Sequence, residues 1–349
     1  SSELKDRDGE VANNWYIACL TRELKDKPIR RIIYDTPYVI YRDDDGKVVC
    51  LEDRCLHRNA PLSSGWKNKN CVVCPYHGWE YDQDGKVVHI PSEGPETEPV
   101  KNLKIKKIPC VEQDFAIWLW TGKGEPVTET PPWKFPNYGE KGWINYCMIT
   151  DMEGEVTDLC ENFMDVPHTV FVHAGWFRDQ KKIKNPMQVD TGNGRVLITY
   201  LQEQDEFSLG ARLLLNPQGN KMKHTDEYIY PNFTCVRYDF GGNGFVINSQ
   251  CTPVGTLNSR VYTYIAYKVP VIGPMLKPLI QYYTRKVINQ DVDIMKIQAT
   301  NFKLDPVRIF RSTPADEVHK SIERLRHYGE KGDDKLLTFS DSKKVDFWI

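Results

Sequence analysis

The sequence has 349 residues, of which 40% are hydrophobic and 27% are charged, and its formal net charge at pH 7 is -2. This length and composition predict two globular domains, each with its own core. A net charge near zero, without a clustered basic excess, argues against nucleic acid as a partner.

Cysteine usage and the first residues predict the compartment. Ten Cys in 349 residues are too few for a disulfide scaffold, and thiolate ligands of a metal cluster need a reducing compartment during assembly. No apolar run follows Ser1, so no secretory signal is predicted and the expected location is cytoplasmic. Seven cysteines are predicted to be free, mostly buried thiols: Cys19, Cys50, Cys110, Cys147, Cys160, Cys235 and Cys251.

The first half, 12–125, is predicted to be a small all-β domain. Short runs of branched and aromatic residues alternate with hairpin turns such as Asp44–Gly46 and Asp84–Gly85. No long helical period interrupts these runs. The predicted strands cover 14–19, 38–41, 47–51, 86–90 and 116–120.

Two short loops of this half carry metal-ligand residues. The first is Cys55-Leu56-His57, and the second, sixteen residues after His57, is Cys74-Pro75-Tyr76-His77-Gly78-Trp79. Two thiolates and two imidazoles delivered in pairs match a [2Fe-2S] cluster in which His replaces Cys on one iron. Cys55 and Cys74 would hold one iron, and His57 and His77 the other. Both loops are expected to be hairpin tips with the His rings near the surface.

Two other readings of these cysteines are less favoured. A structural zinc site also uses two Cys and two His, but zinc fingers usually pair like ligands as C-x2-4-C and H-x3-5-H. Cys71 and Cys74 form a C-x-x-C pair, yet no βαβ pattern surrounds them, as a thioredoxin-like motif would require.

A Pro- and Gly-rich stretch, with the linker placed at 126–142, separates this half from a predicted α+β domain at 143–349. The spacing of Asp158 and Glu161 resembles a capping box at the start of a helix. An antiparallel sheet follows, and the predicted strands cover 195–201, 233–238, 244–248 and 260–267. Two later helices are predicted at 275–302 and 315–326.

One segment of this domain, Val269–Ile280, is apolar enough to raise the question of membrane insertion. The segment is shorter than a bilayer span, contains three Pro and carries Lys277. No transmembrane segment is predicted, and a pocket wall or core segment is favoured over a peripheral lipid contact.

The helix after the linker holds a second candidate site. His168 and His173 are the imidazoles that a non-haem Fe(II) centre with two His and one carboxylate requires. On a regular helix, residues five apart point about 140° away from each other. Pro167 predicts a break that can turn both rings toward one ion. Taken alone, the two His could equally be unrelated core or surface residues.

Helical periodicity separates two candidates for the third ligand. The residues three and four positions from Asp291 are apolar, which places its carboxylate in a buried stripe. The neighbours of Asp293 are mostly polar. A carboxylate in a core is costly unless it is paired or binds metal, so Asp291 is the predicted ligand. His224, His319 and His327 lie in polar surroundings and are expected at the surface.

Both sites together resemble the Rieske non-haem iron oxygenases. C-x-H followed by C-P-Y-H-G-W matches the Rieske cluster motif, and 162–173 matches the pattern N-x-x-D-x-x-H-x4-H of these enzymes. Asp291 stands in a Gln-Asp-x-x-Ile string that also occurs there. The chain is closest in form to the single-subunit, homotrimeric group that includes vanillate and dicamba demethylases, pheophorbide a oxygenase and saxitoxin-pathway oxygenases.

The resemblance implies a mechanism and partners. A separate flavin/iron-sulfur reductase or ferredoxin would deliver electrons from NAD(P)H, because the sequence has no G-x-G-x-x-G signature of its own. Asp165 would link the cluster of one subunit to the mononuclear iron of the next, and Asn162 would line the iron site. With O2, the enzyme would hydroxylate or oxidatively demethylate a small organic substrate.

The substrate and the reaction outcome stay open at this point. Phe207, Phe233, Tyr238 and Phe245, with the segment 269–280, suggest an apolar or aromatic pocket, although such residues also build ordinary cores. Hydroxylation, demethylation and desaturation depend on the bond presented to iron. The alternative function is a Rieske-type electron carrier without oxygenase activity.

Overall fold

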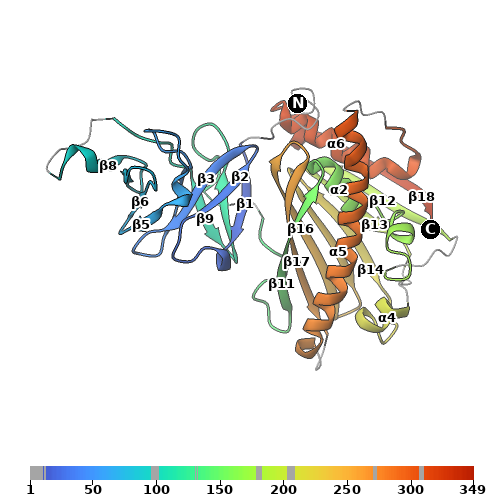
Figure 1. The fold of residues 1–349 in the computed structure, drawn as a ribbon. Helices are drawn as coiled ribbons and strands as arrows, with labels where there is room; N and C mark the ends of the chain where they lie inside the picture. Colours follow the sequence, from blue (N-terminus) through green and yellow to red (C-terminus); the bar gives the residue numbers. More distant parts are fainter. Residues whose placement is uncertain are drawn as a thin grey trace. The chain divides into compact units, whose positions relative to one another are not determined.

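The computed structural model describes residues 11, 13–95, 102–129, 131, 133–177, 183–202, 209–269, 273–305 and 310–349. Within these ranges the chain forms two compact units, Ala12–Lys134 and Phe135–Ile349 (Figure 1). The first is all-β and the second joins one large antiparallel sheet to helices, which confirms the predicted fold class.

The first unit contains three small antiparallel sheets. One has the order β1 (Trp15–Leu20), β10 (Ala116–Trp120), β9 (Cys110–Gln113); another is β2 (Ile29–Ile33), β3 (Thr36–Arg42), β4 (Val48–Glu52); the third is β5 (Trp66–Asn68), β6 (Cys71–Val73), β7 (Glu80–Tyr81), β8 (Val87–His89). Short 3-10 helices lie at Thr21–Glu23, Leu62–Ser64 and Pro91–Glu93. The strands absent from the prediction, such as β5 and β7, are only two to five residues long, too short for a period to show.

The chain beyond residue 125 still packs on this first unit. The indole N–H of Trp15 donates to the carbonyl of Thr128 at 3.3 Å, and Gln113 Nε2 donates to the carbonyl of Trp133 at 2.8 Å. These bonds hold the segment that follows β10 against β1 and β9.

The second unit is built on an eight-stranded sheet in which all neighbours are antiparallel. Its order is β11 (Ile144–Glu153), β17 (Asn258–Lys268), β16 (Gly244–Gly255), β15 (Phe233–Asp239), β14 (Lys223–Ile229), β13 (Arg195–Tyr200), β12 (Lys184–Gly192), β18 (Ser340–Trp348). The four predicted strands correspond to β13, β15, β16 and β17. The strands β11, β12, β14 and β18 were not predicted. The polar sequence of β18 lies at the sheet edge, where little burial is needed.

Helices cover one face of this sheet. They are α2 (Val156–Met164), α3 (Thr169–Val172), α4 (Leu209–Leu215), α5 (Gly273–Leu304), α6 (Glu317–Glu330) and α7 (Lys335–Thr338), with a 3-10 turn at Pro314–Asp316. Figure 1 shows α5 running along the strands beside α2 and α6. Tyr146 of β11 and Thr284 of α5 share a hydrogen bond of 2.9 Å, and Arg285 donates to Thr150 at 2.8 Å, which fixes α5 on the sheet. None of the described helices is long and apolar enough to cross a membrane.

The helix boundaries correct two details of the prediction. The helix α2 begins at Val156 with Glu155 at its N-cap, so Asp158 and Glu161 are interior residues and form no capping box. The predicted last helix begins later and continues to Glu330. The buried side of α2, including Val156, Leu159 and Met164, packs into the same core as the sheet, which explains why the helix forms here without a capping side chain.

Candidate metal centres and the cavity beside them

The two cluster loops arise from different local structures. The loop with Cys74 and His77 joins β6 to β7, where Val73 pairs with Glu80, and is the expected hairpin tip. The loop with Cys55 and His57 was also predicted to be a hairpin tip, and this prediction was wrong, because the loop connects β4 of one sheet to β5 of another. Its position depends on a contact between two sheets that is not visible in a local pattern.

Backbone hydrogen bonds hold each loop in a tight turn. Cys55 N–H donates to the carbonyl of Ala60, and Cys74 N–H donates to that of Trp79, both at 2.9 Å. Gly78 adopts a φ of 73°, which is costly for other residues, and a side chain there would also meet Pro91. These constraints set the positions of the ligand residues before any metal binds.

The four predicted cluster ligands form a buried pair of Cys and a more exposed pair of His, as expected. Cys55 and Cys74 are each 1% exposed and lie in the core of the first unit, whereas His77 is exposed and His57 half-buried. Burial raises the pKa of Cys74, while backbone N–H groups of Tyr76 and His77 oppose this and Cys55 lies within side-chain hydrogen-bonding reach. The His57 and His77 ring centroids are 4.4 Å apart.

The atoms around His57 fit a bound cluster. Its ring stacks on Trp79 at 5.0 Å with an interplanar angle of 7°. Its Nδ1 atom is buried and has no hydrogen-bond partner among the described residues. A buried imidazole nitrogen is normally satisfied, so an orphan beside His77 and two buried thiols is expected where a metal takes the lone pair.

A tyrosine hydroxyl lies beside one of the thiolate ligands. Tyr81 OH donates to Cys55 Sγ at 3.2 Å and accepts the backbone N–H of Leu56 at 2.9 Å. Tyr81 is fully buried, and burial together with the hydrogen bond to Cys55 raises the pKa of its hydroxyl. Sequence reasoning did not identify this residue as part of the site.

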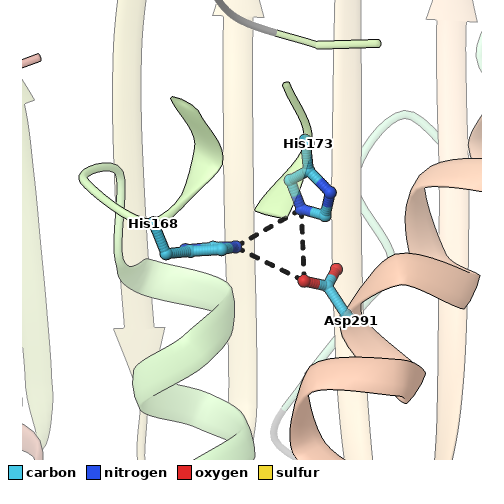
Figure 2. A group of neighbouring side chains, drawn as sticks. All are labelled: His168, His173 and Asp291. Atoms are coloured by element: carbon cyan, nitrogen blue, oxygen red, sulfur yellow. Dashed lines mark hydrogen bonds and ion pairs between the residues drawn. The ribbon is translucent and has the colours of Figure 1, made fainter. Parts of the chain in front are cut away.

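The second candidate site forms where α2 ends. The helix stops at Met164, the short helix α3 starts at Thr169, and Pro167 lies between them, so the predicted break is present. Figure 2 shows the rings of His168 and His173 and the carboxylate of Asp291 pointing toward one another, the last from α5. The break therefore directs two His that are five residues apart to one point.

The geometry of this triad fits a metal ion. His168 Nε2 lies 3.3 Å from His173 Nε2, and the two nitrogens lie 3.3 and 3.1 Å from Asp291 Oδ1. Ligands held at about 2.1 Å from one first-row ion are about 3 Å apart when adjacent. Two His and one carboxylate on one side of an ion leave open positions, as in non-haem Fe(II) oxygenases.

Hydrogen bonds at the outer ring nitrogens orient both His rings. His173 Nδ1 donates to Gln290 Oε1 at 2.9 Å, and His168 Nδ1 donates to the backbone carbonyl of Asp165. With Nδ1–H engaged, each Nε2 is left as the lone-pair atom that faces Asp291. The local sequence did not predict the bond to Gln290, because Gln290 comes from a different helix.

The residues of the triad shift each other's pKa values. Burial favours the neutral carboxyl group of Asp291, but the neighbouring imidazoles of His168 and His173 outweigh burial and lower its pKa. Burial disfavours the charged form of His168, yet Asp291 and Asp165 raise its pKa overall. Burial raises the pKa of Asp165. Asp293 is exposed while Asp291 is 8% exposed, in agreement with the helical periodicity.

A cavity opens beside the triad, between the helices and the sheet. With its mouth and the solvent in it, the cavity encloses about 800 Å³ of atom-free space. Both predicted site residues Asn162 and Asp165 line it, and the Oδ1 atom of Asn162 is buried without a partner among the described residues. The remaining lining is mostly apolar and includes Met152, Phe163, Phe177, Val236, Tyr238, Ile247, Val287 and Ile288.

The predicted pocket aromatics are only partly those of the cavity. Tyr238 lines it, whereas Phe233 and Phe245 are buried elsewhere in the core, and Phe207 lies outside the described residues. Of the segment 269–280, residues 270–272 also lie outside them, and none of the others lines the cavity.

His224 corrects a prediction. It is 2% exposed rather than a surface residue, and its Nε2 donates to Asp226 Oδ1 at 2.6 Å. Asp226 also lines the cavity. Sequence reasoning did not identify it, because the polar residues of β14 are typical of a strand that faces solvent. All ten cysteines are free, and the seven outside the cluster motif and its C-x-x-C pair are mostly buried, as predicted.

Two family models match the chain. Residues 14–118 match the Rieske [2Fe-2S] domain, and residues 152–325 match the vanillate O-demethylase oxygenase C-terminal domain. The first match contains all four predicted cluster ligands, and the second contains His168, His173 and Asp291.

Curated relatives match parts of the chain. The dicamba O-demethylase oxygenase component of Stenotrophomonas maltophilia is 35% identical over 189 residues, 53% of this chain and 54% of that protein. Chlorophyllide a oxygenase of Arabidopsis thaliana is 36% identical over 169 residues, 48% of this chain and 30% of that protein. Protein TIC 55 of Arabidopsis thaliana is 32% identical over 302 residues, 83% of this chain and 54% of that protein. The chain thus spans about half of these relatives' length or less.

Solved structures share the fold over nearly the whole chain. Dicamba monooxygenase bound to 3,6-dichlorosalicylic acid aligns with a TM-score of 0.78 at 23% identity, covering 92% of this chain and 98% of that one. NdmA of Pseudomonas putida CBB5 with caffeine aligns with a TM-score of 0.80 at 20% identity, covering 98% of both.

Proposed function

This chain belongs to the Rieske oxygenases, and from that premise we propose that it is an oxygenase component that hydroxylates or oxidatively demethylates a small, mainly apolar or aromatic molecule. The overall reaction would be C–H + O2 + 2 electrons + 2 protons giving C–OH + H2O. In the demethylation case, the hydroxylated methyl group leaves as formaldehyde. Electrons would come from NAD(P)H through a separate flavin/iron-sulfur reductase or ferredoxin.

The observation that carries this proposal is the triad at the wall of the cavity. Bound by His168, His173 and Asp291, Fe(II) would supply open positions at which O2 is activated. Gln290 and the Asp165 carbonyl keep the two His in the binding tautomer. The apolar lining excludes water and holds a substrate beside the triad.

The first unit supplies the residues for electron transfer. Cys55 and Cys74 would hold one iron of a [2Fe-2S] cluster, and His57 and His77 the other. Because both Cys side chains are buried and His77 is exposed, the His-bound iron would lie nearer the surface, where a partner could approach.

The remaining proposals concern assembly. We propose a homotrimer in which Asp165 links the cluster of one subunit to the triad of the next; its side chain is 24% exposed and adjoins His168, which supports a contact with another group. Asn162 would contact bound ligands. We also propose the division 12–125, 126–142 and 143–349, supported by the family matches, and a cytoplasmic location, supported by ten cysteines that form no disulfide.

The test uses full-length protein reconstituted with iron and sulfide. The reconstituted protein is incubated with a surrogate reductase, NADH and a panel of methoxylated and alkylated aromatics, while O2 uptake and product mass are followed. We expect product formation coupled to O2 uptake, and loss of both in Asp291→Asn. A cluster that cycles between redox states without mononuclear iron or O2-dependent product would instead identify an electron-transfer protein.

A further inference from the structure

A buried carboxylate forms part of the cavity wall opposite the helices. Asp226 lies on β14, is 2% exposed and lines the cavity. It is no neighbour of the metal triad in sequence, and the proposed reaction does not require it. A carboxylate taken out of water is costly unless it is hydrogen-bonded or paired, so its presence in a mainly apolar wall needs a reason.

Two side chains hold Asp226 in place. Tyr200 OH donates to Oδ2 at 2.9 Å, and His224 Nε2 donates to Oδ1 at 2.6 Å. The imidazole of His224 is itself stacked between the rings of Tyr200, at 4.1 Å, and Tyr238, at 4.3 Å. The carboxylate is thus pre-oriented by a rigid set of neighbours on β13, β14 and β15.

Asp226 can still accept a hydrogen bond from a ligand. Each carboxylate oxygen has two acceptor sites, and each has one protein donor in the contacts above. Directly opposite Asp226 on β15 lies Val236, which also lines the cavity. Hydroxyl groups of Thr234, Ser249 and Thr263 pair across β15, β16 and β17 and supply further polar atoms to the lining.

The charge of the cavity excludes one class of ligand. Asp165, Asp226 and Asp291 all line it, and no Lys or Arg is among the described lining residues. At Asp226, a ligand carboxylate would face buried negative charge without a Lys or Arg side chain to pair with, which is unfavourable. A ligand N–H or O–H group could donate to Asp226 directly.

We propose that Asp226 is a specificity-determining residue that accepts a hydrogen bond from an amine or hydroxyl group of the substrate, and that carboxylate substrates are excluded. This inference rests on the proposed function, because it takes the cavity as the substrate pocket. The donor group would bind at Asp226, and the apolar body of the molecule would contact the apolar residues that line the same cavity as His168 and His173.

The experiment measures binding without turnover. Iron-loaded, anaerobic enzyme with an oxidised cluster is titrated calorimetrically with 4-methoxybenzylamine, 4-methoxybenzyl alcohol and 4-methoxybenzoate at pH 7.5. We expect at least one donor probe to bind about tenfold or more tightly than the benzoate, the size of effect expected for a hydrogen bond to a charged group. The amine and alcohol arms distinguish a cationic from a neutral donor.

Variants test whether Asp226 causes the preference. Asp226→Asn keeps the shape but removes the charge, and we expect the ratio of donor to benzoate affinity to fall at least about tenfold. If the Asp226→Asn variant does not fold, Asp226→Ser replaces it, because serine removes the same charge and is smaller. Asp293→Asn, an exposed change on α5 outside the cavity, should retain the wild-type ratio. Circular dichroism and cluster absorbance report folding.

The proposal is overturned if benzoate binds as tightly as the better donor probe, if neither donor probe binds, or if a folded Asp226 variant keeps the wild-type ratio. The proposed oxygenase function fails separately. That failure would be an enzyme that retains no mononuclear iron or never couples O2 uptake to product, while the binding preference measured without O2 persists.

Discussion

His173 donates from Nδ1 to the side-chain oxygen of Gln290 at 2.9 Å, and Gln290 directly precedes Asp291. One turn of α5 therefore contributes both a candidate ligand and the group that orients another ligand. Adjacent residues on a helix point about 100° apart, which allows Gln290 to reach the far side of the His173 ring while Asp291 faces its Nε2.

We predict that Gln290→Leu weakens mononuclear metal binding about 10- to 100-fold, the usual cost of losing an outer hydrogen bond to a metal ligand. The His173 ring would lose the acceptor that selects its tautomer. Equilibrium dialysis with Fe(II), or with Co(II) as a spectroscopic probe, measures the change. Gln298→Leu, an exposed site on the same helix, is the matched control; equal affinities for the two variants would contradict the role of Gln290.

Removing the carboxylate of the triad should affect only one of the two candidate metal centres. We predict that Asp291→Asn reduces mononuclear iron to a small fraction of the wild-type content and leaves acid-labile sulfide unchanged, because the cluster ligands lie in a different compact unit. Asp293→Asn should keep both. Iron and sulfide analysis of reconstituted protein measures this. Wild-type iron content in Asp291→Asn would exclude Asp291 as a ligand.

The hydroxyl group of Tyr81 should tune the cluster potential. Its hydrogen bond to Cys55 Sγ at 3.2 Å stabilises the more negative, reduced cluster. Losing a hydrogen bond of about 1 kcal/mol corresponds to about 40 mV for one electron, so Tyr81→Phe should lower the reduction potential by roughly that amount. Protein-film voltammetry measures the shift. Tyr76→Phe, which is 64% exposed on the cluster loop, should cause little change; equal shifts would argue against the Tyr81 bond.

Buried thiols should be inert in the folded protein. Burial raises the pKa of both Cys19 and Cys235 to about 12, so almost no thiolate exists at pH 8 and iodoacetamide should react only after unfolding. Unfolded thiols ionise near pH 8.5. The folded state therefore holds more protons above that pH, and stability should decline as pH rises from about 8.5 toward 12. Peptide mass spectrometry after labelling checks the first expectation, and rapid labelling of native Cys235 would refute it.

Several features could be predicted from the sequence because they depend on near neighbours in the chain. The cluster motif places its ligands within loops of a few residues, and Pro167 interrupts a helix through its own ring and missing N–H. The burial of Asp291 and exposure of Asp293 follow from the helical period. The strands richest in branched and aromatic residues, such as β10 and β17, were also identified, whereas the long strands β11, β12, β14 and β18 were not.

Tertiary structure alone decided which polar residues became part of the cavity. The string around His224 and Asp226 alternates as a solvent-facing strand would, and only the pairing of β14 with β13 and β15 turns those side chains toward the helices. Gln290 reaches His173, 117 residues away, only because α5 crosses the sheet beside α3. Local sequence specifies the backbone and the ligand types, whereas the inward face of a strand depends on the elements that cover it, because burial is a property of the assembled core.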